Sequence, residues 1–433
     1  MIFCIISILL FLITFFVTPK ERRHIDNPIL SFLFLWNIIL FLATLRLDGL
    51  LQTNNTAYFC ITTGLASTAI TYCIFTILNK KNTHTQATDT VIKNNINYRF
   101  LHILAIICII FYIPQFIESL VRLINGADIV NIRLSAQNYT SDGSFLSKII
   151  IFLQNFIILP SCFTIEVFSI VDYWFGKRDK KLLALTIAIT LIRFIVDGGR
   201  TPIVNLLVYF IVAYILHGHT AHKEEKQKSF KNKKKPIIIS VCATILIIVT
   251  SMLRTNSTLS RQAYFYFSMP PVMLSQWNSH VETKSILTFG ATSVNGALFT
   301  AAYPIVNALN TSYPDFIAKP YDLIAKTDSE WKKISTQGTT ANAYVSLFWF
   351  FYTDGRLLGV ILGCCLYALL LSKYHNKVCG NSSTRDLAIF LLLFQGMCFS
   401  FIRFPFAKHY YVVTFIFIIL ATINRKANNV SHN

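Results

Sequence analysis

The chain has 433 residues, of which 54% are hydrophobic and only 14% are charged, and its formal net charge is +19. Water-soluble globular proteins are less apolar, and roughly a quarter of their residues are charged. The composition therefore excludes a soluble fold and predicts an all-α, polytopic integral membrane protein.

Apolar stretches close to the roughly 20 residues that a helix needs to cross a bilayer recur along the whole chain. The first lacks a basic n-region and an A-x-A cleavage site, so we interpret it as a retained helix and not as a signal peptide. Together the stretches make residues 1–433 a single transmembrane domain. In chain order we expect eleven spans, near residues 2–17, 28–45, 57–78, 99–120, 149–171, 182–196, 201–217, 236–252, 343–372, 386–402 and 409–423.

Lysines and arginines are concentrated in alternate connections between these spans, as the positive-inside rule predicts for cytoplasmic loops. This pattern puts the N-terminus outside and the C-terminus inside. Residues 218–235 are expected to form a solvated basic cytoplasmic loop, with binding to anionic lipid headgroups as the alternative. Since orientation explains much of the positive charge, nucleic acid is not expected as a partner. The basic residues of these connections are Lys20, Arg22, Arg23, Lys80, Lys81, Lys93, Lys177, Arg178, Lys180, Lys181, seven lysines within 223–235, Lys373, Lys377, Arg385, Arg425 and Lys426.

The longest connection, residues 253–342, is expected to be a large periplasmic loop. Its apolar and aromatic stretches, broken by prolines at 270, 271, 304, 314 and 320, predict short amphipathic helices at the outer membrane surface or dipping into the bundle. Residues 286–309 are long enough to span, but an added span would place the later basic loops outside, against the charge rule. The outer connection at 121–148 is interpreted as a lid over the same functional site as the loop 253–342.

Other motifs bear on the class of protein. Nine of the ten cysteines lie in apolar stretches, and the sequence contains neither a CxxC pair nor a GxxxxGK[ST] loop. We therefore expect no disulfide framework, no metal or other cofactor, and no ATP-driven pump.

Arginines recur on the side of the membrane that orientation does not favour. A charge in hydrocarbon costs roughly 2.5 to 3.5 kcal/mol, and a guanidinium forms two-pronged hydrogen bonds to phosphate oxygens. We therefore expect these side chains to bind a diphosphate headgroup. The alternative is that each reaches the membrane interface or pairs with a local acid such as Asp197 or Asp354. The arginines are Arg193, Arg200, Arg254, Arg261, Arg356 and Arg403.

Arg200 is the most informative of them because it lies in the segment Asp197-Gly-Gly-Arg-Thr-Pro202. The two glycines permit a tight turn, and Pro202 suits the first turn of the helix that follows. The N-terminus of that helix would add a partial positive charge to an anion bound by Arg200.

Several further residues are candidates. On the outer side, His280 and His409 can serve as neutral general bases, although each has a structural alternative. Glu118 and Glu166 lie inside apolar spans, where an unpaired acid is functional by default, and Glu118, close to the outer end of its span, has the alternative of reaching the membrane interface. The aromatic residues Tyr264, Tyr266 and Trp277 can stack on sugar rings or belong to a membrane-interface belt.

Taken together, three segments resemble the Wzy-type O-antigen polymerases, the oligosaccharide repeat-unit polymerases of bacterial surface polysaccharide synthesis. They are Asp197-Gly-Gly-Arg200-Thr-Pro202, Tyr264-Phe-Tyr-Phe-Ser-Met-Pro270, and Thr339-Thr-Ala-Asn342-Ala-Tyr344 continuing into Phe351-Tyr-Thr-Asp354-Gly-Arg356-Leu-Leu-Gly359 and Gly363. An RX10G pattern of some family members is not met at Arg200, because Ile211 stands where the glycine would be.

The resemblance implies a metal-independent glycosyltransferase of the bacterial inner membrane. It would join repeat units carried on undecaprenyl diphosphate at the periplasmic face, among membrane lipids and with a chain-length regulator protein as partner. Arg200, Arg254 and Arg261 are nearest to the arginines important in that family, and Tyr264 and Asn342 lie in the matching segments. His280, Asp197 or Asp354 would accept the proton of the acceptor hydroxyl. An O-antigen ligase and a polysaccharide-unit flippase or other transporter are the alternatives.

Overall fold

The computed structural model describes residues 2–79, 95–126, 145–220, 259–309, 311–380 and 382–423. These residues are overwhelmingly helical, which confirms the all-α class. Two of the apolar helices are short, α1 (Ile2–Val17) and α19 (His409–Leu420). Six described helices are long and apolar enough to cross a membrane: Pro28–Leu45, Asn55–Leu78, Tyr98–Ile124, Ser147–Phe175, Thr201–Gly218 and Ser346–Cys379.

All but one of the expected spans coincide with described helices. The exception, 236–252, lies outside the described residues, as do most of the basic loop and residues 127–144 of the expected lid. The span expected at 149–171 is built from α7 (Phe145–Leu153), one π-helical turn (Gln154–Ile158) and α8 (Leu159–Phe175). The others correspond to α1, α2 (Pro28–Leu45), α3 (Asn55–Leu78), α5 (Tyr98–Ile124), α9 (Lys180–Val196), α10 (Thr201–Thr220), α17 (Ser346–Cys379), α18 (Thr384–Cys398) and α19.

Polar residues fix where some of these helices begin. The Asn27 side chain accepts hydrogen bonds from the backbone N–H groups of Ile29 at 3.1 Å and Leu30 at 3.3 Å, and Pro28 takes the first position of α2. Such caps satisfy amide groups that the start of a helix otherwise leaves without a partner. The helix therefore begins where the apolar stretch begins.

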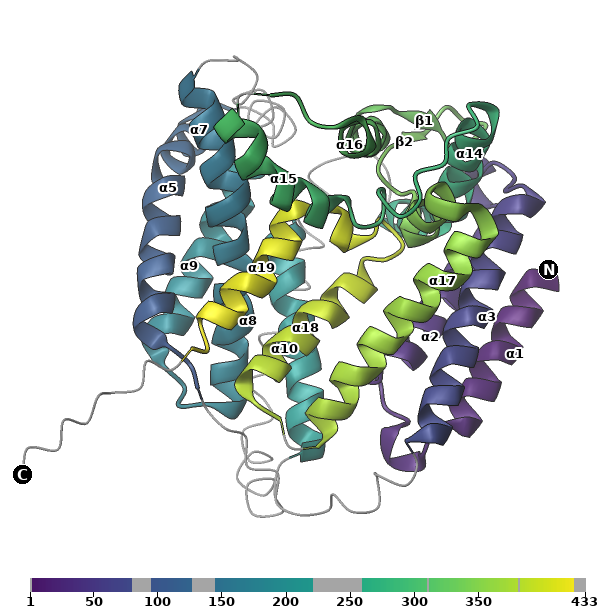
Figure 1. Ribbon diagram of the computed structural model, residues 1–433, viewed down its shortest axis with the longest axis horizontal. Coiled ribbons are helices and arrows are strands. Elements are labelled where there is room, and N and C mark those ends of the chain that lie inside the picture. Colours follow the sequence, from purple (N-terminus) through teal and green to yellow (C-terminus); the bar gives the residue numbers. More distant parts are fainter. Residues whose placement is uncertain are drawn as a thin grey trace, which may run out of the picture. The chain divides into compact units, whose positions relative to one another are not determined.

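The chain divides into two compact units. Unit 1 comprises the described residues within 1–88, 248–376 and 393–412, and unit 2 those within 89–247, 377–392 and 413–433. In unit 1, α1, α2 and α3 pack side by side (Figure 1). The rings of Trp36 on α2 and Phe348 on α17 lie 4.8 Å apart, and Gly64 on α3 leaves no room for a Cβ beside Phe348.

Short helices fill the long connection of unit 1, as the sequence predicts. They are α13 (Leu259–Ser268), α14 (Pro270–Thr283), α15 (Asn295–Leu309) and α16 (Asp315–Ser329). At about 1.5 Å per residue, α15 is roughly 22 Å long and so shorter than the hydrocarbon core of a bilayer. Pro270, Pro271 and Pro314 start helices, but Pro304 and Pro320 lie inside helices, so the prediction that every proline would break the chain is wrong.

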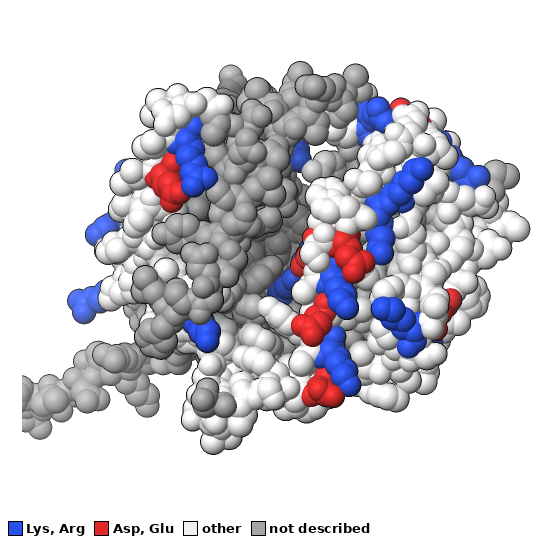
Figure 2. Space-filling view, turned by 90° about the horizontal axis from the view of Figure 1, so that it is seen from above, with Lys and Arg blue, Asp and Glu red and all other residues white. Residues whose placement is uncertain are grey.

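A small hairpin, not expected from the sequence, completes this region. Its strands β1 (Lys332–Lys333) and β2 (Thr340–Ala341) are antiparallel, and the Leu51 N–H beyond α2 donates to the Ile334 carbonyl at 2.9 Å. In Figure 1, α14, α16 and the hairpin lie together at one end of the unit 1 helices. Seen from that end, acidic and basic side chains alternate on the surface (Figure 2).

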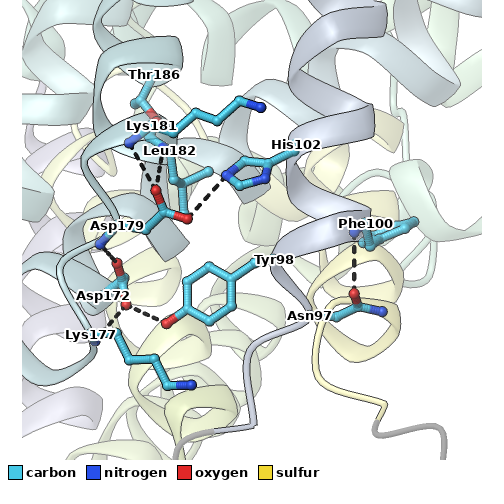
Figure 3. Close-up of polar contacts among 10 residues, drawn as sticks. All are labelled: Asn97, Tyr98, Phe100, His102, Asp172, Lys177, Asp179, Lys181, Leu182 and Thr186. Atoms are coloured by element: carbon cyan, nitrogen blue, oxygen red, sulfur yellow. Dashed lines mark hydrogen bonds and ion pairs between the residues drawn. The ribbon is translucent and has the colours of Figure 1, made fainter.

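In unit 2, α5, α8, α9 and α10 pack against one another. The turn from α8 to α9 closes around the Asp172 carboxylate, which accepts hydrogen bonds from the Tyr98 hydroxyl at 2.5 Å and from the backbone N–H groups of Lys177 at 2.9 Å and Asp179 at 2.6 Å (Figure 3). Asp179 caps α9 and lies 3.2 Å from Nε2 of His102. These two acids therefore tie α5 to the turn.

Candidate functional site

Arg193, expected to contact a substrate, is buried inside unit 2. Its Nη1 lies 3.2 Å from Oε1 of Glu166 on α8, and its Nη2 lies 3.6 Å from Oδ2 of Asp197. The side chain is 5% exposed and Glu166 is 1% exposed. The structure therefore agrees with the alternative interpretation, in which the arginine pairs with nearby acids. Asp197, one of the proposed bases, is one of these partners.

The turn before α10 has the conformation predicted for it. Gly198 has φ of 52°, in the left-handed region that favours glycine. The Arg200 carbonyl accepts the first helical hydrogen bond of α10, from the Val204 N–H at 3.0 Å, and Pro202 lies in the first turn. Arg200, which is partly exposed, is thus placed at a helix N-terminus, as the sequence indicates.

Asp354 and Arg356 lie at a kink within α17 in unit 1. The Asp354 carboxylate accepts hydrogen bonds from the Thr288 hydroxyl at 2.6 Å and from the backbone N–H groups of Thr292 at 2.8 Å and Ser293 at 3.0 Å. Arg356, at φ of 53°, donates to the Val281 carbonyl at 3.4 Å. Asp354 therefore fixes the turn before α15, a role that competes with proton transfer.

Arg261 and Tyr264, both on α13, contact neighbouring segments of unit 1. The Tyr264 hydroxyl accepts from the Leu47 N–H at 2.8 Å and lies 3.2 Å from the Leu42 carbonyl, so the ring joins α13 to the end of α2. Arg261 donates to the Gln337 side chain at 2.7 Å. These contacts support the fold of the region, and Tyr264 is 9% exposed. Arg254 lies outside the described residues.

His280 lies on α14 in a basic environment. Burial lowers the pKa of its imidazole below the usual 6.5, and Lys284 and Lys332 lower it further, while Glu330 opposes them. Lowering the pKa favours the neutral imidazole, the form that a general base requires.

In the described part of unit 1, one carboxylate is shared by two cations. The guanidinium nitrogens of Arg403 lie 2.6 Å and 2.9 Å from the Asp328 carboxylate oxygens, and Nζ of Lys408 donates to Oδ2 at 2.8 Å. The Asn342 side chain donates to the backbone carbonyl of Asp328 at 2.5 Å. Arg403 and Asn342 are thus two predicted residues that the structure brings together. We call Asp328, Arg403 and Lys408 the cation cluster.

The backbone around the cation cluster is closely packed. Asp328 is near the end of α16, and Arg403 and Lys408 flank the short 3-10 turn Pro405–Ala407. Gly296 at the start of α15 lies against this turn, so that a Cβ there would be 2.5 Å from the Phe406 carbonyl oxygen. Lys408 is therefore held by the backbone of α15 as well as by Asp328.

The cation cluster keeps an excess positive charge in a partly desolvated place. Two cations and one carboxylate leave a formal charge of +1, and the side chains of Arg403 and Lys408 are 24% and 21% exposed. Burial raises the pKa of Asp328, but the charges of Arg403 and Lys408 outweigh this and hold it below its usual value. Burial and Arg403 lower the pKa of Lys408. An added anion would relieve the repulsion between the two cations.

Sequence reasoning missed Asp328 and did not select Lys408. Lys408 has a signal, because it is a second cation five positions after Arg403, in a connection that the charge pattern predicts to lie outside. Asp328 has none, since it is one of several acids alternating with lysines along α16.

Comparisons of the chain with protein-family models, with curated proteins and with solved structures found no match.

Proposed function

We propose that this protein is an integral membrane glycosyltransferase that polymerises oligosaccharide units carried on undecaprenyl diphosphate into a surface polysaccharide, at the periplasmic face of a bacterial inner membrane. The observation that carries the proposal is the cation cluster, two cations sharing one carboxylate beside the short helices of the long connection. Such a site suits a diphosphate headgroup, and its residual charge favours binding.

The proposed reaction needs little beyond binding and proton transfer. The bond between the anomeric carbon of the growing chain and its lipid diphosphate breaks, a new bond forms to a hydroxyl of the incoming unit, and undecaprenyl diphosphate leaves. Arg403 and Lys408 would stabilise the negative charge on the leaving diphosphate. The neutral imidazole of His280 would accept the hydroxyl proton.

The proposal includes the topology expected from the charge pattern: eleven spans, N-terminus outside, C-terminus inside, and 253–342 periplasmic. Two exposed lysines allow a matched test, Lys319 on α16 and Lys180 at the start of α9. In intact spheroplasts, a membrane-impermeant maleimide should label Lys319→Cys, and Lys180→Cys only after permeabilisation. The reverse pattern would invert the topology.

A deletion strain tests the activity. Loss of a polymerase should leave single repeat units attached to lipid A, whereas loss of a ligase should leave polymer unattached and loss of a flippase should leave units trapped inside. Restoration of long chains by the wild-type gene, and not by an Arg403→Ala variant of equal abundance, would connect the activity to the cation cluster. Unattached polymer or trapped units in the deletion strain would replace the proposal with one of its rivals.

One observation favours a transporter as the second candidate. Glu166, the buried partner of Arg193, lies within Ser147–Phe175, a helix long and apolar enough to cross a membrane, where ionisable residues often mark transport pathways. The deletion strain decides between the two, because a flippase defect and a polymerase defect leave different products.

A further inference from the structure

Three aromatic side chains stack near the cation cluster. The ring of Phe299 on α15 lies 4.9 Å from that of Tyr313 at an interplanar angle of 17°, and 5.0 Å from that of Tyr321 on α16 at 15°. Nearly parallel rings at these distances are stacked face to face, so a ligand can reach only the ring faces that the stack leaves uncovered. We call Phe299, Tyr313 and Tyr321 the aromatic stack.

The aromatic stack and the cation cluster are joined through α16. Tyr321 and Asp328 are seven residues apart, so they lie on the same face of the helix, about 10 Å apart along its axis. His409, which follows Lys408, has its ring 5.3 Å from Phe299. Burial raises the pKa of Tyr321, and the charges of Asp322 and Asp328 raise it further. The effect of Asp328 is consistent with the short distance between Tyr321 and the cation cluster.

Part of the aromatic stack is accessible. Tyr321 is 42% exposed although Phe299 covers part of its ring. A partly exposed aromatic ring suits a sugar, whose apolar ring face packs on the aromatic face while the sugar's hydroxyl groups form hydrogen bonds. The distance of about 10 Å along α16 is long enough for a first sugar between a diphosphate at the cation cluster and a sugar on the aromatic stack.

We propose that the aromatic stack binds a sugar ring of the lipid-linked oligosaccharide whose diphosphate lies at the cation cluster. The inference rests on the proposed function and assigns the glycan a place on α15 and α16. Specificity for the glycan would come from the aromatic stack, and affinity for the headgroup from Arg403 and Lys408.

The test compares two lipids on the purified full-length protein in nanodiscs. One is undecaprenyl diphosphate, and the other is the undecaprenyl-diphosphate-linked oligosaccharide extracted from a strain lacking this protein. The wild type should bind the glycan-bearing lipid more tightly. Tyr321→Leu and Tyr313→Leu should each weaken that binding by about two- to tenfold, the effect of losing one aromatic stacking contact, and leave undecaprenyl diphosphate binding unchanged.

Two further variants separate sugar binding from packing. Tyr321→Phe preserves the ring and should retain most of the preference for the glycan-bearing lipid. Phe316→Leu removes an aromatic side chain of α16 that is 59% exposed and not part of the aromatic stack, and it should have no effect. If Tyr321→Leu fails to fold, Tyr313→Leu and Tyr321→Phe carry the comparison.

The outcomes distinguish the inference from the proposed function. Equal binding of the two lipids by the wild type, or an equal loss for both lipids in the leucine variants, would overturn the sugar site and leave the proposed function standing. Failure of the wild type to bind either lipid would overturn the proposed function itself.

Discussion

Glu166 and Arg193 form an ion pair that is almost completely buried, with Oε1 and Nη1 3.2 Å apart and side-chain exposures of 1% and 5%. Glu118 and Arg122 form a second pair at 2.6 Å, but their exposures are 45% and 43%. Both glutamates lie within apolar stretches of the sequence, but the structure places one in a buried pair and the other in an exposed pair. The first pair is a buried connection between α8 and α9, and the second is a contact within the exposed surface of α5.

This difference predicts unequal effects on stability. Glu166→Ala leaves a buried guanidinium without its nearest partner and should destabilise the protein by about 3 to 5 kcal/mol. Glu118→Ala should cost no more than about 0.5 kcal/mol, because exposed pairs four residues apart contribute little. Thermal unfolding of the two variants in the same detergent checks this. Equal unfolding temperatures for the two variants would mean that Asp197 alone is enough to neutralise Arg193.

The two glutamates also show what the sequence can predict. Apolar helices can be predicted from the sequence because hydropathy is a local property. The predicted stretches 2–17 and 28–45 accordingly coincide with α1 and α2. Whether an acid is paired depends on residues far along the chain: Glu166 meets Arg193 27 positions later. Asp328 meets Arg403 75 positions later, and nothing near it in sequence signals that contact.

Arg403 should matter more for activity than an exposed cation nearby. Losing a charge-assisted contact of roughly 1.5 to 3 kcal/mol in the transition state corresponds to about a ten- to hundredfold lower rate. Arg403→Ala should show this loss, and Arg403→Lys a smaller one, since lysine keeps the charge but not the planar geometry. Lys319→Ala is the control, because Lys319 is 75% exposed and pairs only with Asp315 among the contacts described. Polymer length at matched abundance is the measurement. If Arg403→Ala still made full-length polymer, the cation cluster would not be part of the substrate-binding site.

Gly296 should be intolerant of even a methyl group. A Cβ there would lie 2.5 Å from the Phe406 carbonyl oxygen and 2.7 Å from that of Lys408, so the backbone that holds the cation cluster would have to move. We expect Gly296→Ala to destabilise the protein by about 1 to 3 kcal/mol and to reduce polymer length. Gly218→Ala has nothing within 4 Å of its Cβ and should be neutral or slightly stabilising. Similar unfolding midpoints for both variants would contradict the close packing of α15.

The pH dependence of activity tests His280 as the general base. Its pKa is lowered from 6.5, so the folded protein keeps the imidazole neutral as pH falls through 6.5, while the unfolded chain takes up a proton. Activity should therefore decline only below pH 6.5, and the stability contributed by the neutral form should decrease over the same range. A pH–rate profile measured on wild type and His280→Gln gives the answer. A decline centred at or above pH 6.5, or one unchanged in the variant, would assign the base elsewhere.

Arg200 is predicted to contact an anionic part of the lipid-linked glycan. It follows Gly198, whose φ is 52°, and its carbonyl accepts the first hydrogen bond of α10, so its side chain starts at a helix N-terminus where anions are stabilised. Arg200→Ala should lose activity by about ten- to hundredfold, and Arg200→Lys should retain part of it because the charge remains. Lys180→Ala, at the opposite end of α9, is the control. Chain-length distribution on lipid A is measured alongside membrane abundance. Normally abundant Arg200→Ala that still makes long polymer would make Arg200 an interfacial anchor instead of a substrate contact.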